Sequence, residues 1–90
     1  PLNDVSVKCG YRGSAGASCS IRHVSGLDRI KTCWSVDLTC KNKAVVKGYG
    51  CVELDPGSTV THVLSADEFD TSGCDAVKTT GIGSISVVEL

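Results

Sequence analysis

Six cysteines in a chain of 90 residues are the side chains with the most distinctive chemistry. Cysteine thiolates either bind zinc or join as disulfides, and zinc ligands usually come in close pairs such as C-x2-C. Here 9, 13, 6, 10 and 22 residues separate successive cysteines, so no close pair exists. The even number and the density instead predict three disulfides, as in small secreted domains. We therefore expect no metal site and a secreted, extracellular location.

Catalytic chemistry has little support in the remaining polar residues. His23 and His62 are the only histidines, and neither belongs to a motif such as H-x-H or H-E-x-x-H. No G-x-S-x-G turn presents a serine nucleophile. Four acidic residues lie close together but lack the spacing of a calcium loop: Asp67, Glu68, Asp70 and Asp75. We expect a protein that is not an enzyme and that has no catalytic residue and no cofactor.

A glycine-rich stretch over 10–18 lies between Cys9 and Cys19. It lacks the Gly-Lys-Ser/Thr ending of a phosphate-binding loop, so a flexible loop clamped by cysteines is the simpler interpretation. The alternative is a recognition loop, because Tyr11 and Arg12 are residue types that anchor interfaces. Tyr49 is a third possible interface residue, against the alternative of an ordinary cross-strand filler.

Residues 30–54 show the clearest element pattern. Even positions of 30–40 carry mostly apolar side chains and odd positions mostly polar ones, and the alternation returns over 44–54. This period of two predicts two strands that each bury one face. The turn between them, at 41–43, contains Asn42, a residue that tolerates a left-handed backbone.

The register of this hairpin follows from matches between its strands. Placing Cys40 opposite Ala44 brings three pairs together on the outer face: Cys33 with Cys51, Asp37 with Lys47, and Lys31 with Glu53. Cross-strand opposite charges stabilise a ladder, and a shift of one residue would separate all three pairs. The register therefore predicts a Cys33–Cys51 disulfide.

The four remaining cysteines allow three connectivities. Cys9–Cys19 together with Cys40–Cys74 requires the least rearrangement of the chain, and we favour it over the other two.

The rest of the chain is also rich in strand patterns. Turn residues Pro56 and Gly57 favour a type II turn at 55–58, and Ser65 with Glu68 forms a capping-box pattern that predicts a short helix ending by 71–73. Further strand-like runs cover 5–9, 19–21, 59–64 and 82–90.

We predict a mainly β fold, a small disulfide-stapled antiparallel β-sandwich or barrel with one short helix. The alternative is an α+β sandwich with two helices, from 65–78 and part of 20–30, on one sheet.

Length and charge limit the remaining possibilities. Residues 1–90 are one domain, because a second could not bury enough apolar surface. Residues 1–50 carry eight basic and three acidic side chains (+5), and residues 51–90 carry one basic and seven acidic (−6). Either a polar surface recognises a charged partner, or the halves pack together and neutralise each other.

The net charge of −1 argues against a nucleic-acid partner, and no apolar run is long enough for a membrane span. The start at Pro1 suggests a processed, secreted chain.

The overall format resembles the small secreted cysteine-rich proteins of fungi, which include apoplastic effectors and killer-toxin-like proteins. The similarity lies in the chain length, the six cysteines, a strand with Trp34 and the few aromatic residues. No functional residue is carried over from it. The resemblance implies binding to a host or competitor target outside the cell, most simply a protein.

The main rival function is inhibition of a secreted protease or amylase, which could use the 10–18 loop or the 55–58 turn. A carbohydrate- or wall-binding module ranks lower, because such sites usually expose several aromatic rings.

Overall fold

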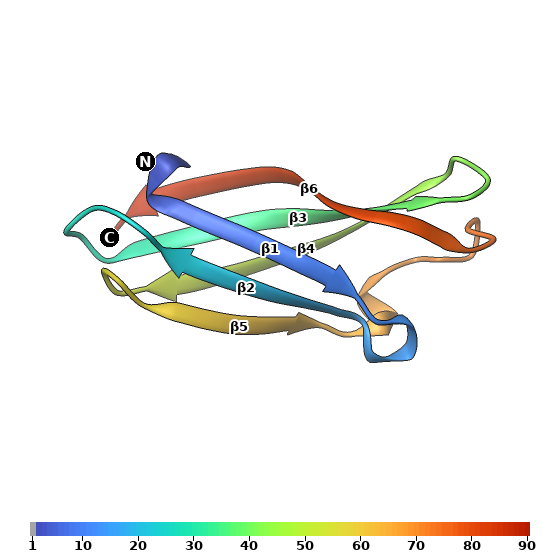
Figure 1. Ribbon diagram of the computed structural model, residues 1–90, viewed down its shortest axis with the longest axis horizontal. Coiled ribbons are helices and arrows are strands. Elements are labelled where there is room, and N and C mark those ends of the chain that lie inside the picture. Colours follow the sequence, from blue (N-terminus) through green and yellow to red (C-terminus); the bar gives the residue numbers. More distant parts are fainter. Residues whose placement is uncertain (1) are drawn as a thin grey trace.

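Two three-stranded antiparallel sheets make up the molecule, as the computed structural model describes it over residues 2–90 (Figure 1). One sheet has the order β1-β2-β5 and the other β4-β3-β6. β1 lies beside β6 and β5 beside β4, so the sheets face each other as a sandwich of 44 × 20 × 16 Å. The elements are η1 (Leu2–Asp4), β1 (Val5–Tyr11), η2 (Gly13–Ala15), β2 (Ala17–His23), β3 (Ile30–Cys40), β4 (Val45–Leu54), β5 (Thr59–Leu64), η3 (Ala66–Glu68) and β6 (Val77–Glu89).

The hairpin of β3 and β4 has the predicted register. Cys33 pairs with Cys51, Asp37 with Lys47 and Lys31 with Glu53. The turn at 41–43 forms as predicted, but its left-handed residue is Lys43, with a φ of 73°. Asn42 remains outside the left-handed region, and its side chain instead donates to the Gly73 carbonyl at 2.9 Å.

Three disulfides tie the strands together, and the structure has the favoured connectivity. Cys33–Cys51 links β3 to β4, and Cys9–Cys19 links β1 to β2. Cys40–Cys74 attaches the long 65–76 connection to the end of β3. No described cysteine is free. The antiparallel, disulfide-stapled β fold is therefore confirmed.

The helical predictions are where the structure differs. The capping box of Ser65 and Glu68 forms, but it opens only a single 3-10 turn, η3. Phe69 leaves this turn in an extended conformation (φ −108°, ψ 124°) and its ring enters the core. Burial of a large ring thus outweighs continuation of the helix. The alternative with two helices on one sheet is wrong, because residues 20–23 belong to β2 and residues from 77 onward belong to β6.

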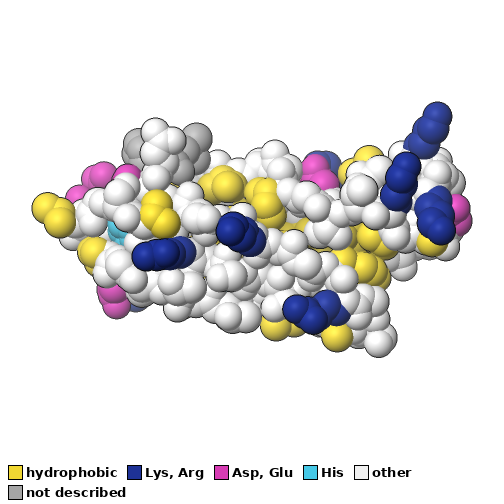
Figure 2. Space-filling view, viewed as in Figure 1, with side chains coloured by type: hydrophobic (Ala, Val, Ile, Leu, Met, Phe, Trp, Pro, Cys, Tyr) yellow, Lys and Arg dark blue, Asp and Glu magenta, His cyan; other side chains and the backbone are white. Residues whose placement is uncertain are grey.

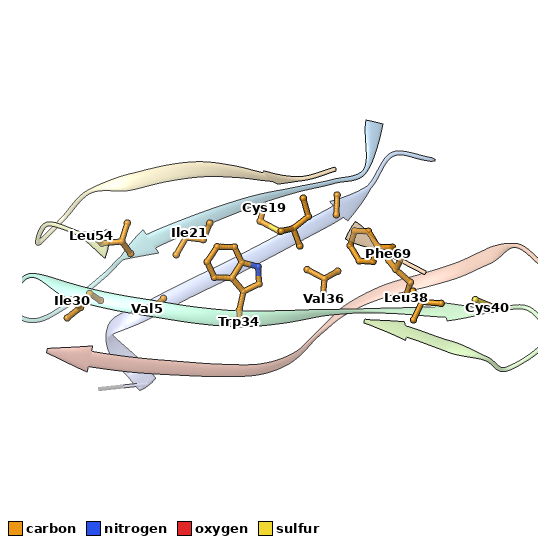
Figure 3. Close-up of a cluster of buried hydrophobic side chains, with 13 residues drawn as sticks. Val5, Cys19, Ile21, Ile30, Trp34, Val36, Leu38, Cys40, Leu54 and Phe69 are labelled. Atoms are coloured by element: carbon orange, nitrogen blue, oxygen red, sulfur yellow. The ribbon is translucent and has the colours of Figure 1, made fainter. Parts of the chain in front are cut away.

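The core lies between the sheets and is centred on Trp34, which is only 2% exposed (Figure 3). Its ring lies over Gly50, and the ring of Phe69 lies over Gly48, so two glycines of β4 make space for two large rings. The other large buried side chains come from four strands, two in each sheet: Ile21, Ile30, Val36, Leu38, Leu54 and Leu64.

β6 departs from simple alternation at a β-bulge. Ile85 pairs with Trp34, but Ile82 pairs with Val36, so Gly83 and Ser84 together oppose the single residue between them on β3. The extra residue changes which positions of the strand face inward: even-numbered residues do so before the bulge and odd-numbered residues after it. Both isoleucines consequently pack against the core.

Candidate functional site

The outer face of the β4-β3-β6 sheet carries the most exposed ring of the molecule, that of Tyr49, at 67% exposure. Its neighbours Gly48 and Gly50 are buried beneath aromatic rings. Because successive residues of a strand point to opposite faces, the burial of these two positions directs Tyr49 outward. Tyr49 is thus held on a regular ladder rather than on a loop.

A shallow hollow of about 210 Å³ adjoins the Tyr49 ring. The Cys33–Cys51 disulfide forms part of its wall, and Ser84 and Ser86 of β6 form another part. Cys33 pairs with Cys51 on one side and with Ser86 on the other, so three adjacent strands build the hollow. A ring and a disulfide offer an apolar surface of fixed shape, which suits an apolar side chain of a partner.

Polar groups continue the same outer face along β3 and β4 beyond the hollow. Lys47 Nζ donates to Asp37 Oδ1 at 2.9 Å, and the two side chains lie across the strand pair from each other. The hydrogen bond to Asp37 raises the pKa of Lys47 above its ordinary value. Nearer the hollow, the hydroxyls of Ser35 and Ser84 are 3.1 Å apart. An aromatic anchor with a polar border is the usual composition of a protein interface.

Tyr11 does not join Tyr49 on this face. Its ring meets Phe69 edge to face, with the centroids 6.1 Å apart, and its side chain is half-buried. Phe69 covers Gly48 on the inner side of β4, whereas Tyr49 lies on the outer side of the same strand. The three residues proposed from the sequence as an interface are therefore split between two surfaces.

Arg12 is exposed at the start of a tight turn that follows β1. Its N–H donates to the Gly16 carbonyl at 2.7 Å, and η2 lies between these two residues. Gly16 has a φ of 80°, and any Cβ there would meet the Leu64 carbonyl and the backbone around Ser65. The 10–18 stretch is consequently a compact hydrogen-bonded turn on a disulfide-linked base.

Both histidine rings contact other parts of the fold. His23 is buried, and its Nε2 lies 2.8 Å from the Asp28 carbonyl oxygen, so the ring anchors the loop between β2 and β3. The ring of His62 packs edge to face against Trp34, with centroids 5.5 Å apart. Each ring is thus used in packing or loop anchoring.

The acidic residues near η3 are engaged in local turns. Glu68 accepts hydrogen bonds from both the backbone and the hydroxyl of Ser65, and Asp67 accepts from the same hydroxyl. Hydrogen bonds from the Ser72 hydroxyl and backbone lower the pKa of Asp70. Across residues 2–90, no cluster of three or more potential metal ligands is found.

Sequence reasoning missed the contribution of β6 to the Tyr49 hollow. The bulge at 83–84 turns the even positions Ser84 and Ser86 to the outer face, although Ile82 before it faces inward. The one available signal was Gly83 inside a β-branched run, since an isolated strand glycine often marks a bulge or a close approach. A Cβ at Gly83 would lie 2.5 Å from the Asp37 carboxylate.

Nothing in the described part of the chain is both helical and long and apolar enough to span a membrane. Comparisons with protein-family models, with curated proteins and with solved structures find no match to this chain.

Proposed function

We propose that this chain is a secreted cysteine-rich binding protein that acts on a protein target outside the cell and contacts it through the face around Tyr49. Its action is binding without catalysis. Three disulfides in so short a chain support an oxidising compartment, because reducing compartments rarely maintain them.

The exposure of Tyr49 beside the Cys33–Cys51 disulfide is the observation that carries this proposal. Tyrosine is enriched among the residues that dominate binding energy at interfaces. A ring on a disulfide-linked ladder loses little conformational freedom on binding, which lowers the entropic cost of association. The hollow next to it can receive one side chain of the target.

Photo-crosslinking from this face tests the proposal. Benzoylphenylalanine in place of Tyr49 should form a discrete adduct with one extracellular protein when the labelled chain is applied to intact target cells and their medium. Excess wild-type chain should compete the adduct away. The matched control places the same group at Leu27, which is 94% exposed in the loop between β2 and β3 and belongs to neither sheet. Adducts that are equal from both positions, or that resist competition, would contradict the proposal.

A substitution measures the energetic role of the ring once the adduct is identified. Tyr49→Ser should weaken binding to that protein roughly tenfold or more, as expected for an interface anchor. Val45→Ser, two outward positions away on the same strand, removes a different exposed apolar side chain and should change the affinity much less.

Inhibition of a secreted protease or amylase is the second candidate, and the turn at Arg12 favours it. The turn is exposed, closed by hydrogen bonds and linked at its base by Cys9–Cys19, which is the kind of rigidity an inhibitory loop needs. A panel of secreted proteases and glycosidases should then include one that is inhibited at nanomolar concentration, with the effect lost in Arg12→Ala. Uninhibited activity throughout the panel would remove this candidate.

A further inference from the structure

The outer face of the β1-β2-β5 sheet, which the Tyr49 site does not use, has an unusual composition. Its outward positions carry two cations, five hydroxyls and no carboxylate. In strand order they are Ser6, Lys8 and Gly10 of β1, Ser18, Ser20 and Arg22 of β2, and Thr59, Thr61 and Val63 of β5. Figure 2 views the molecule from the side of β1 and β2 and shows Lys and Arg side chains across the middle of this face.

The strand register arranges these groups in two equivalent rows. In one row Arg22 lies between Ser6 and Thr59, its partners on the neighbouring strands. In the next row Ser20 lies between Lys8 and Thr61. Each row therefore offers one cation and two hydroxyls. Neighbouring strands are about 4.8 Å apart and successive rows are about 6.7 Å apart. The same set of groups therefore occurs twice along the sheet, with the cation on β2 in one row and on β1 in the next.

These groups are free to meet a ligand. The ion pairs found among residues 2–90 use Arg29 and Lys47, not the cations of this face. The side-chain hydrogen bonds of the described residues use other hydroxyls, those of Ser25, Thr32, Ser35, Ser58, Ser65, Ser72 and Ser84.

The shape of the face also suits a ligand. A hollow of about 330 Å³ is lined by both cations and by three of the hydroxyls: Ser6, Lys8, Ser20, Arg22 and Thr59, with Val24 at its border. Beneath it the Cys9–Cys19 disulfide joins β1 to β2. The relative placement of the two rows is thus set before a ligand arrives, which lowers the cost of binding.

We propose that this face binds an anionic polysaccharide. Lys8 and Arg22 would pair with its carboxylate or sulfate groups, and the neighbouring hydroxyls would exchange hydrogen bonds with its sugar hydroxyls. The repeat of cation and hydroxyls in successive rows fits a polymer that repeats the same two groups along its length. The face has no exposed ring, so the polysaccharide would be held by charge and hydrogen bonds and not by the ring stacking that carbohydrate modules usually use. The same absence removes the usual anchor of a protein interface and the stacking surface for nucleic-acid bases. It also lies on the opposite sheet from Tyr49, so it does not depend on the function proposed for that residue.

Affinity measurements with defined polymers test this site. Polygalacturonate supplies carboxylates, dextran sulfate supplies sulfates, and dextran is the neutral control. The wild-type chain should bind at least one of the two charged polymers, more weakly as salt increases, and should not bind dextran. Whichever polymer binds then identifies the anionic group that the face prefers.

Matched variants distinguish binding through this face from non-specific attraction between the polymer and the charge of the molecule. Lys8→Gln with Arg22→Gln should weaken binding roughly tenfold or more, because both charged contacts are lost. Lys31→Gln with Lys43→Gln removes the same charge from exposed positions elsewhere and should have an effect below about twofold. Ser20→Ala with Thr61→Val keeps the charge and should still weaken binding, because the sugar loses hydrogen-bond partners. Near-ultraviolet circular dichroism shows that each variant is folded.

Three results would overturn the proposal. The first is the absence of binding to both charged polymers. The second is an equal loss in the two lysine and arginine double variants. The third is equal or tighter binding to polyglutamate, single-stranded DNA or phosphatidylglycerol vesicles, which would identify a different class of partner. Tyr49→Ser should leave polysaccharide binding unchanged, so failure of the Tyr49 proposal can be told apart from failure of this one.

Discussion

At the scale of single residues, small side chains opposite large rings explain both the core and the exposed site. Gly50 and Gly48 of β4 give space to Trp34 and Phe69 on the inner side. The same strand then presents Tyr49 on the outer side. A close-packed interior cannot accept extra atoms without shifting neighbours, so these two glycines are as important to the face as the tyrosine.

Gly50→Ala should destabilise the fold. The new Cβ would lie 2.6 Å from Cζ2 of Trp34, whose ring is also held against His62. Overpacking of this kind costs about 1–3 kcal/mol, measurable by urea unfolding. Gly81→Ala is the control, since no atom lies within 4 Å of its Cβ position, and its effect should stay within about 0.5 kcal/mol. Equal losses in both variants would show that strand glycines as such, and not the ring contact, determine the effect.

The pair of Lys47 and Asp37 has a definite dependence on pH. The hydrogen bond to Asp37 raises the pKa of Lys47 in the folded state. The stabilising effect of the pair is therefore complete below the unfolded-state pKa and is lost as the pH rises through the folded-state pKa. Asp37→Asn should lower the pKa of Lys47 toward its ordinary value, followed by NMR titration of the lysine side chain. Asp28→Asn should leave this titration unchanged, and an unshifted Lys47 in Asp37→Asn would contradict the assignment.

At the scale of elements, the disulfides differ in how much chain they constrain. Cys9–Cys19 and Cys33–Cys51 each join partners that are already opposed on paired strands. Cys40–Cys74 instead links the end of β3 to the 65–76 connection, which contains no strand. That connection also carries Phe69 into the core. The third disulfide thus helps to keep a core ring in place.

Removal of Cys40–Cys74 should cost more stability than removal of Cys9–Cys19. The two bridges span 34 and 10 residues, and loop-closure entropy then assigns them about 4 and about 3 kcal/mol. The double alanine variants of each pair, compared by chemical unfolding, give the measurement. A larger loss from the shorter loop would show that local strand geometry outweighs chain entropy in this fold.

At the scale of the whole molecule, the charge asymmetry of the sequence is neutralised only in part. Arg29 forms ion pairs with Glu53 at 2.8 Å and with Asp55 at 3.1 Å, and these join the basic first half to the acidic second half. Lys8 and Arg22 point outward from the other sheet. Neutralisation between the two halves is therefore present at Arg29, whereas recognition of a charged partner by the remaining cations stays a prediction.

The sandwich separates two surfaces of different character. One presents an aromatic ring beside a disulfide, and the other presents cations among hydroxyls. Because the two lie on opposite sheets, a chain that uses both could bind a protein target while held on a charged polymer. Binding through one face should leave the affinity of the other unchanged.

Local pattern alone determined the class of fold and much of the connectivity. Alternation in 30–54 set the register of β3 and β4, and that register predicted Cys33–Cys51. This succeeded because strand periodicity and cross-strand pairing are properties of neighbouring residues.

Only the tertiary structure decided the features that depend on distant parts of the chain. The capping box at Ser65 stops after one turn because Phe69 is needed in the core, and Tyr11 is drawn against that ring. The bulge at 83–84 turns two β6 serines toward the hollow that Tyr49 also lines, and the pairing of β2 with both β1 and β5 builds the cationic face. Burial and strand order are decided between segments far apart in sequence, and no local pattern contains them.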